Sequence, residues 1–140
     1  MTHAIPAFPP LSPEWLQADQ ACDELRTFLG KKSRAQWLSH GTATFYTRQS
    51  QRILPGSRDL QPTLDLANIM TEGEQGGMEN ALSIYRWVDA CEKVAKETGR
   101  ALFVENVFNE TLCRFFRQRK YQEIETYGVS SFCKTTKPVE

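Results

Sequence analysis

Hydrophobic side chains recur along this chain with two different periods, and the change of period marks the predicted elements. After a proline-rich start, apolar residues at helical spacing over 13–30 predict a helix, with Ser12 and Pro13 as a typical helix start. We expect a second short helix over 31–39. A run of β-branched and aromatic residues over 42–54 then predicts the first strand.

The middle of the chain alternates strand and helix. The Pro-Gly pair at 55–56 predicts a turn that folds residues 63–70 back as a partner strand. A loop with glycines leads into a helix that begins at Met78 and is closed by Gly99. The short apolar run over 101–107 is typical of a buried strand.

The end of the chain adds one short helix, which Asn109 can cap, and two short strands over 121–124 and 130–133. A strand, a helix and a second strand in succession imply a parallel crossover, whereas hairpins imply antiparallel neighbours. The order of elements therefore predicts an extended arm over 1–12 and one α/β domain over 13–140. This domain would hold a mixed sheet and two N-terminal helices.

Charge and hydropathy narrow the class of protein. The chain has 17 Lys and Arg against 17 Asp and Glu, so its net charge is zero. Proteins that hold nucleic acid or an anionic membrane need a surplus of cationic side chains, so we expect neither as a partner. No apolar run approaches the ~18 residues of a membrane span, and the first ten residues lack signal-peptide features. We therefore expect a cytoplasmic protein.

The cysteines and histidines argue against metal and hydrolase chemistry. The four cysteines lie far apart without a C-x-x-C pair, and we expect reduced thiols. The two histidines, His3 and His40, have no partner at ligand spacing, and no G-x-S-x-G elbow accompanies them. Neither a metal site nor a serine hydrolase is predicted.

The loop before the helix that begins at Met78 is the most suggestive local feature. Backbone amides at a helix N-terminus suit a phosphate, and Gly76 and Gly77 would let the backbone approach it closely. The loop matches neither a Walker P-loop nor G-x-G-x-x-G. A plain turn explains two adjacent glycines as well, and Glu72 and Glu74 oppose a phosphate unless they point away.

Four motifs together resemble the GNAT superfamily of N-acetyltransferases, in a compact branch common in phage and bacterial genomes. They are an Arg-x-Ser-x-Arg strand at 48–52, a Leu-Asp-Leu-Ala-Asn-Ile strand at 64–69, a Val-Glu-Asn-Val-x-Asn segment at 104–109 and a Ser-Phe-x-Lys ending at 131–134. The resemblance implies a GNAT-like sheet and a site for acyl-CoA.

In that family the end of one strand binds the pantetheine arm, and the following loop and helix start wrap the pyrophosphate. The resemblance implies that Asn68, Ile69 and Met70 bind the pantetheine arm. The pyrophosphate would meet the backbone amides of the loop and helix start, where we place Gln75, Gly76, Gly77, Met78, Glu79 and Asn80. Asn109 matches a family asparagine near the cofactor, although an N-cap explains it equally well.

Two positions depart from the family pattern. Phe116 occupies the cofactor-site position where many relatives have a tyrosine that can protonate the departing CoA thiolate, and phenylalanine has no proton to donate. Lys120 replaces the glycine of the family's Gly-Phe/Tyr ending. The loop also lacks the second spaced glycine of the family.

Glu105 and Asn106 are the candidate catalytic residues. Direct transfer needs a base for the proton of the attacking ammonium group, and Glu105 lies beside the expected slot. A charge within an apolar strand is costly unless it is paired, so a salt bridge from Glu105 to Arg48 or Arg52 is an equally good interpretation. Asn68 and Asn106 would be polar groups near the site or satisfied sheet amides.

The preferred interpretation is an enzyme that transfers an acetyl group from acetyl-CoA to an amine of a protein or small molecule, directly within a ternary complex. The alternative is a GNAT-fold protein with weak or no catalysis, encoded by a phage, that binds and modulates a host protein in the host cytoplasm. Phe116 and the altered loop favour this alternative. The sequence leaves the acceptor and the oligomeric state open.

Overall fold

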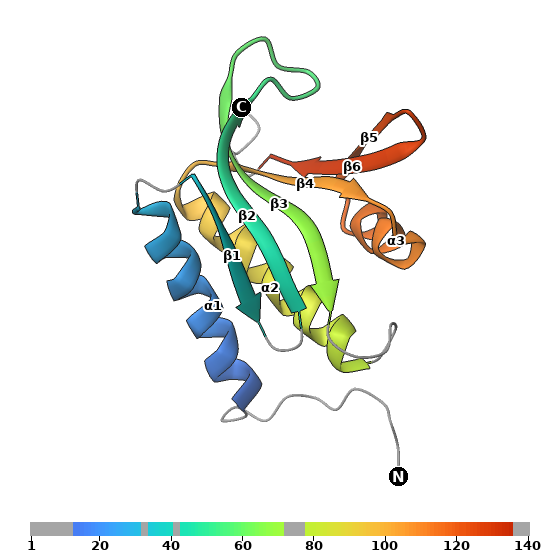
Figure 1. The fold of residues 1–140 in the computed structure, drawn as a ribbon. Coiled ribbons are helices and arrows are strands. Elements are labelled where there is room, and N and C mark those ends of the chain that lie inside the picture. The colour runs from blue at the N-terminus through green and yellow to red at the C-terminus, as the bar shows by residue number, and fades with distance from the viewer. Residues whose placement is uncertain (1–12, 32–33, 41–42, 72–77, 136–140) are drawn as a thin grey trace.

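The computed structural model describes residues 13–31, 34–40, 43–71 and 78–135 (Figure 1). The elements follow in the order α1 (Pro13–Leu29), β1 (Ala35–His40), β2 (Ala43–Arg52), β3 (Gln61–Thr71), α2 (Met78–Glu97), β4 (Ala101–Val107), α3 (Glu110–Gln118), β5 (Gln122–Thr126) and β6 (Val129–Lys134). The predicted α/β class is confirmed, and the predicted strand over 101–107 has the observed bounds of β4.

Six strands form one sheet in the order β1-β2-β3-β4-β6-β5. β3 and β4 are parallel, and the other neighbouring strands are antiparallel. α2 is the crossover that joins the two parallel strands, as parallel neighbours require. The mixed sheet predicted from the order of elements is therefore confirmed, and the carboxyl ends of β3 and β4 point the same way.

The predicted helix over 31–39 is wrong, because this segment holds strand β1. β1 pairs with β2 so that Trp37 lies opposite Tyr46, and the two ring centroids are 5.2 Å apart. Leu38 is buried, whereas the neighbouring Trp37 is 48% exposed. Two adjacent apolar residues fit a helix or a strand, and pairing with β2 decides between them. The described domain has one N-terminal helix, not two.

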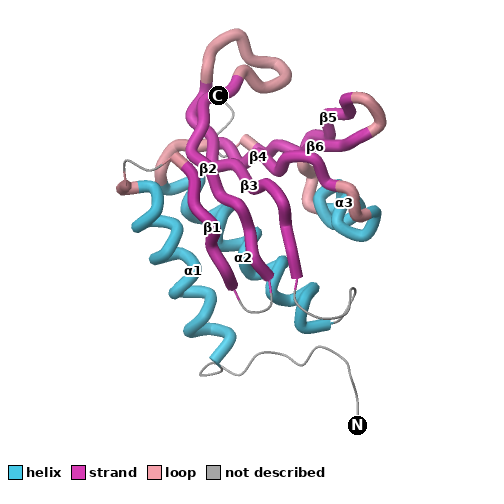
Figure 2. Tube along the Cα trace, in the orientation of Figure 1, coloured by secondary structure: helices cyan, strands magenta, loops and turns pink. Residues whose placement is uncertain are grey.

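The three helices cover one face of the sheet, as Figure 2 shows. The main core brings buried side chains of all three helices together with one face of the strands, among them Leu25, Phe28, Trp87, Val88, Phe116, Phe45, Leu66, Val104 and Phe132. A smaller cluster on the opposite face consists of Leu54, Ala101, Phe103 and Cys133. None of the described helices contributes a residue to it, so we call this side the helix-free face.

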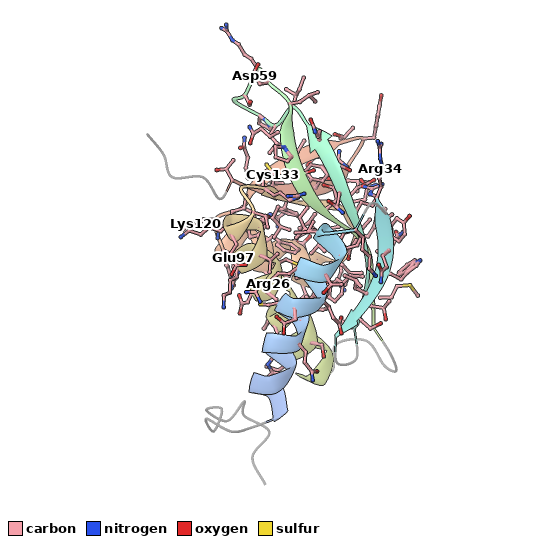
Figure 3. All side chains as sticks on the ribbon, turned by 90° about the vertical axis from the view of Figure 1, so that its left-hand side faces the viewer. Arg26, Arg34, Asp59, Glu97, Lys120 and Cys133 are labelled. Atoms are coloured by element: carbon pink, nitrogen blue, oxygen red, sulfur yellow. The ribbon has the colours of Figure 1, made fainter. Side chains whose placement is uncertain are left out.

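An exposed ion pair ties α1 to α2 beside the core. Arg26 donates two hydrogen bonds to the carboxylate of Glu97, at 3.0 Å from Nε and 2.9 Å from Nη2. Figure 3 shows both residues on the two neighbouring helices. α1 already packs against α2 through buried apolar side chains such as Leu25 and Phe28. The Arg26–Glu97 ion pair therefore helps to orient the two helices but is not the main source of their contact.

α2 and α3 end with the same backbone geometry but different residues. Gly99 follows α2 with φ 69°, and Lys120 follows α3 with φ 68°. Each helix end has the two hydrogen bonds of a Schellman motif. At the end of α2, the Gly99 N–H donates to the Lys96 carbonyl at 3.3 Å and the Arg100 N–H donates to the Ala95 carbonyl at 2.8 Å. At the end of α3, the Lys120 N–H donates to the Arg117 carbonyl and the Tyr121 N–H donates to the Phe116 carbonyl, both at 3.1 Å. Lys120 therefore occupies a left-handed position that disfavours residues with a Cβ.

The β5–β6 hairpin is joined to α3 by a charge-assisted hydrogen-bond network. Arg117 donates to both carboxylate oxygens of Glu123, at 2.8 and 2.9 Å, and the Ser130 hydroxyl also donates to Glu123. These hydrogen bonds lower the pKa of Glu123 from 4.5 to about 2. The carboxylate therefore holds the hairpin against the helix in its ionised form.

Candidate functional site

The two parallel strands pair along only part of their length. Their register runs from Thr63 opposite Ala101 to Leu66 opposite Val104. β3 continues to Thr71 and β4 to Val107, and Figure 1 shows the two strand ends diverging. Open α/β sheets bind ligands beyond the carboxyl ends of their parallel strands, so this parting of β3 and β4 is the candidate functional site.

A β-bulge at an asparagine bends each strand where the two part. Between Ala67 and Met70, β3 has one residue more than the segment of β2 that pairs with it. Between Val104 and Val107, β4 likewise has one residue more than the paired segment of β6. Asn68 (φ 48°) and Asn106 (φ 52°) take left-handed backbone conformations inside these bulges. Asparagine tolerates this conformation better than most residues, and a bulge bends its strand. The two bulges thus direct the strands apart.

Ser131 supports the second bulge from β6. The backbone N–H of Asn106 donates to Ser131 Oγ at 3.0 Å, which satisfies a donor that the bulge removes from the ladder. Both asparagine side chains are exposed. Asn68 and Asn106 both lie at the parting, and their roles in binding and catalysis stay predictions. The motif Ser-Phe-x-Lys pointed to this strand, but sequence reasoning missed the role of Ser131.

Four charged side chains meet on the helix-free face beside the parting. We call Arg48, Arg52, Asp65 and Glu105 the ion tetrad. Asp65 is fully buried and accepts hydrogen bonds from Arg52 Nε at 3.1 Å and Nη2 at 2.8 Å. Thr63 Oγ1 donates to its other oxygen at 2.7 Å. The tetrad therefore supplies a buried carboxylate with the partners that its burial demands.

Glu105 lies at the rim of the ion tetrad, one residue past the last position of β4 that pairs with β3. Its carboxylate contacts the guanidinium of Arg48 and lies 3.5 Å from Arg52 Nη2, and its side chain is 30% exposed. The salt bridge that the sequence offered as one interpretation of Glu105 is thus present. Its role as a base stays a prediction. The Arg52 guanidinium also lies 3.9 Å from the centroid of the Phe103 ring and covers the small cluster of the helix-free face.

The other predicted cofactor residues lie in different surroundings. Ile69 packs against the main core, whereas Met70 is exposed. Asn109 accepts a hydrogen bond from the Leu112 N–H at 3.1 Å, which confirms its role as the N-cap of α3. Phe116 is fully buried in an aromatic cluster, its ring centroid 5.1, 5.0 and 5.3 Å from those of Phe115, Tyr121 and Phe132. Its binding role stays a prediction.

The proposed pyrophosphate site is only partly described. Gln75, Gly76 and Gly77 lie outside the described residues. Met78, Glu79 and Asn80 form the first turn of α2, whose backbone amides have no partners within the helix. The helix N-terminus therefore follows the end of β3, and the binding of phosphate by these amides stays a prediction.

A groove of about 540 Å³ lies elsewhere, between α1 and β1. Its lining includes Asp23, Glu24, Lys31 and Trp37 but none of the predicted site residues. Within the described ranges, no group of three or more Cys, His, Asp and Glu residues could hold a metal ion. The same part of the chain contains no helix that is both long and apolar enough to cross a membrane.

A mixed six-stranded sheet with one parallel pair that parts at two bulges, and with a helix crossing between the parallel strands, is the GNAT-like fold. Comparison with solved structures shows this fold plainly. KacTA in complex with DNA matches with a TM-score of 0.53 and 14% identity over 95% of this chain and 86% of that one. A tyrosine-to-phenylalanine mutant of KacT matches with a TM-score of 0.53 and 16% identity, over 81% of this chain and 82% of that one.

AtaT gives a similar result. A tyrosine-to-phenylalanine mutant of this toxin, bound to the C-terminus of the antitoxin AtaR and to acetyl-CoA, matches with a TM-score of 0.51 and 17% identity over 80% of this chain and 73% of that one. No protein-family model and no curated protein sequence matches the chain. The predicted GNAT-like fold is therefore confirmed by structure at low sequence identity.

Proposed function

We propose that this protein is an acyl-CoA-dependent N-acetyltransferase that moves an acetyl group from acetyl-CoA to an amine. The observation that carries the proposal is the parting of β3 and β4 at two bulged asparagines, with α2 as the next described element after β3. Support comes from AtaT, which has a similar fold and was solved with acetyl-CoA.

In this proposal the pantetheine arm lies between the separated strands, beside Asn68, Ile69 and Met70. The amides of Gln75, Gly76, Gly77, Met78, Glu79 and Asn80 hold the pyrophosphate, where the partial positive charge of the α2 N-terminus favours an anion. Asn109 caps α3 on the other side of the parting, and Asn106 places its amide at the thioester. Phe116 contributes only apolar packing.

The chemical step is direct attack. The amine nitrogen bonds to the thioester carbonyl carbon, backbone amides stabilise the oxyanion, and the carbon–sulfur bond then breaks to release CoA as the thiolate. Glu105 takes the proton of the attacking ammonium group, and Arg48 and Arg52 hold its carboxylate in place. The nitrogen loses its second proton as the carbon–sulfur bond breaks, and water carries that proton to the thiolate, because Phe116 has none to give. Catalysis thus depends mainly on positioning.

Two measurements test the proposal. Calorimetry should show binding of acetyl-CoA, and no binding at millimolar concentration would contradict it. Glu105→Gln should lower kcat by about 100-fold or more with little change in acetyl-CoA affinity. Glu125→Gln, at an exposed position of β5, is the matched control. Unchanged turnover in the first variant would remove Glu105 from the role of base.

A second candidate is a GNAT-fold protein with little catalysis that acts by binding another protein. Phe116 favours it, because its buried ring replaces the expected proton donor. AtaT in complex with the C-terminus of AtaR shows that a protein of similar fold has a polypeptide partner. Acetyl-CoA binding without turnover on any amine would favour this candidate. A phage origin and a location in the host cytoplasm remain hypotheses that belong to it.

A further inference from the structure

Four residues form a continuous row across the helix-free face. Trp37 lies opposite Tyr46, and Tyr46 lies opposite Ala67. Ala67 and Glu105 each follow the last pair of β3 with β4, Leu66 and Val104, so both lie at the start of the parting. Their chain neighbours Leu38, Phe45, Leu66 and Val104 belong to the main core on the other face. Since successive side chains of a strand alternate between faces, the four residues share the helix-free face. We call them the cross-strand row.

Aromatic surface dominates the outer half of this row. Trp37 is 48% exposed on the outermost strand, and its ring is tilted by 55° against that of Tyr46. Ala67 has the smallest side chain of the row and separates Tyr46 from Glu105. Exposed aromatic residues of this size are enriched where proteins bind one another. The row thus leads from an aromatic contact surface to the carboxylate beside the proposed thioester.

The length of the row decides the size of the molecule that it fits. Paired strands lie about 4.8 Å apart, so the backbone at Trp37 on β1 lies about 14 Å or more from that at Glu105 on β4, which has begun to part from β3. A small amine at Glu105 cannot touch Trp37. An extended polypeptide, at about 3.3 Å per residue, covers that distance with four or five residues.

The charge of this face decides the kind of polymer. The two arginines of the ion tetrad are paired with its two carboxylates, so the tetrad sums to zero. Binding of a phosphate backbone requires unpaired cationic side chains. A polypeptide needs apolar contact and main-chain hydrogen bonds instead, and the aromatic pair provides the first of these.

We propose that the acetyl acceptor is a polypeptide that lies across the helix-free face along the cross-strand row. Its backbone crosses β1 and β2 against Trp37 and Tyr46, and one of its amines reaches Glu105 at the parting of β3 and β4. This inference rests on the proposed function and names its substrate class. Trp37 is in this view a specificity residue, far from the reacting atoms.

The test compares two acceptors on the same variants. One is a nine-residue peptide with a single central lysine, and the other is n-propylamine. Trp37→Ala should raise the KM for the peptide about tenfold, because it removes a large aromatic contact. The KM for n-propylamine and the affinity for acetyl-CoA should not change, since both bind beyond the reach of Trp37. Trp37→Phe should restore most of the peptide affinity.

A matched control separates this effect from a general loss of aromatic surface. Tyr127 is fully exposed at the β5–β6 turn, away from the row, so Tyr127→Ala should leave both acceptors unaffected. Calorimetric titration with the peptide alone measures docking apart from catalysis. Weaker binding to Trp37→Ala than to the unmodified protein is the result expected there too.

Several outcomes would overturn the inference. One is an unchanged peptide KM and peptide affinity in Trp37→Ala while n-propylamine is acetylated, which leaves the proposed function intact. Equal loss of both acceptors would make Trp37 a structural residue. Competition of heparin with the peptide would assign the face to a polyanion. Failure to bind acetyl-CoA removes the proposed function instead, and the calorimetric peptide titration then decides on docking.

Discussion

The ends of α2 and α3 offer a sharp test of backbone energetics in this protein. Gly99 and Lys120 have φ values of 69° and 68° and the same pair of hydrogen bonds, yet only one of them is a glycine. We expect Lys120→Gly to stabilise the protein and Gly99→Lys to destabilise it. A side chain at Gly99 would have open space, since an added Cβ meets nothing within 4 Å. Backbone conformation is therefore the main difference between the two residues.

The magnitude follows from two opposing terms. A left-handed conformation costs a residue with a Cβ about 1–2 kcal/mol relative to glycine. Glycine in turn loses about 0.5–1 kcal/mol more backbone entropy on folding. The net change in the free energy of unfolding is about 0.5–1 kcal/mol for each substitution, with opposite signs. In a domain of this size it corresponds to a shift of about 3 °C in Tm.

Urea denaturation of the two single variants and the double variant measures these changes. The double variant should have the stability of the unmodified protein, because distant sites add independently. Changes of the same sign in both single variants would refute the reasoning, as would a lower urea midpoint for Lys120→Gly. Such results would show that the Lys120 side chain contributes contacts worth more than the backbone strain.

Three further predictions concern the charged groups and the bulges. Asp65→Asn should lower the free energy of unfolding by about 3 kcal/mol or more, because it leaves two arginines around one carboxylate, and urea denaturation checks this. Glu123→Gln should be less stable than the unmodified protein above pH 4.5, and this difference in stability should disappear as the pH falls to about 2, because Glu123 stays ionised in the folded protein over that range. Equal differences at pH 7 and pH 2.5 would contradict the prediction, and Glu125→Gln is the control. Asn106→Ala should cost about 1 kcal/mol and Asn106→Gly much less, because φ is 52°, and equal losses in thermal denaturation would contradict the bulge as the reason.

The proposed site contains a feature that sets it apart from the family pattern. Phe116 is packed among aromatic rings with no exposed surface, so a tyrosine hydroxyl there would need a polar partner or a route to the thioester. The proposed mechanism therefore has no side-chain proton donor at this position. Slow release of CoA as an unprotonated thiolate is the chemical consequence that we expect if the protein is an enzyme.

Local patterns were enough to predict much of the fold. The apolar run of β4, the N-cap at Asn109 and the closing Gly99 each depend on a few consecutive residues, and all three appear in the structure as expected. Such features are readable because hydrophobic period, capping side chains and glycine conformations act within one element. The crossover between parallel strands followed from the order of elements alone.

The pairing of strands decided two features that the local sequence pattern did not determine: the structure of the segment around Trp37 and the bulges of β3 and β4. The segment around Trp37 became a strand because β2 offers it a partner, and no signal within the segment distinguishes this from a helix. The bulges at Asn68 and Asn106 likewise appear only when the register of neighbouring strands is compared, so the sequence could name these asparagines but not their left-handed backbone.

The candidate site shows the same division. The sequence by itself placed an unusual carboxylate in an apolar strand and offered two interpretations of it. Only the tertiary structure brought Arg48 and Arg52 to Glu105, beside the buried Asp65. The physical reason is that the type of a side chain is local information, whereas the charges around Glu105 come from two other strands, β2 and β3, whose alignment with β4 depends on the whole sheet.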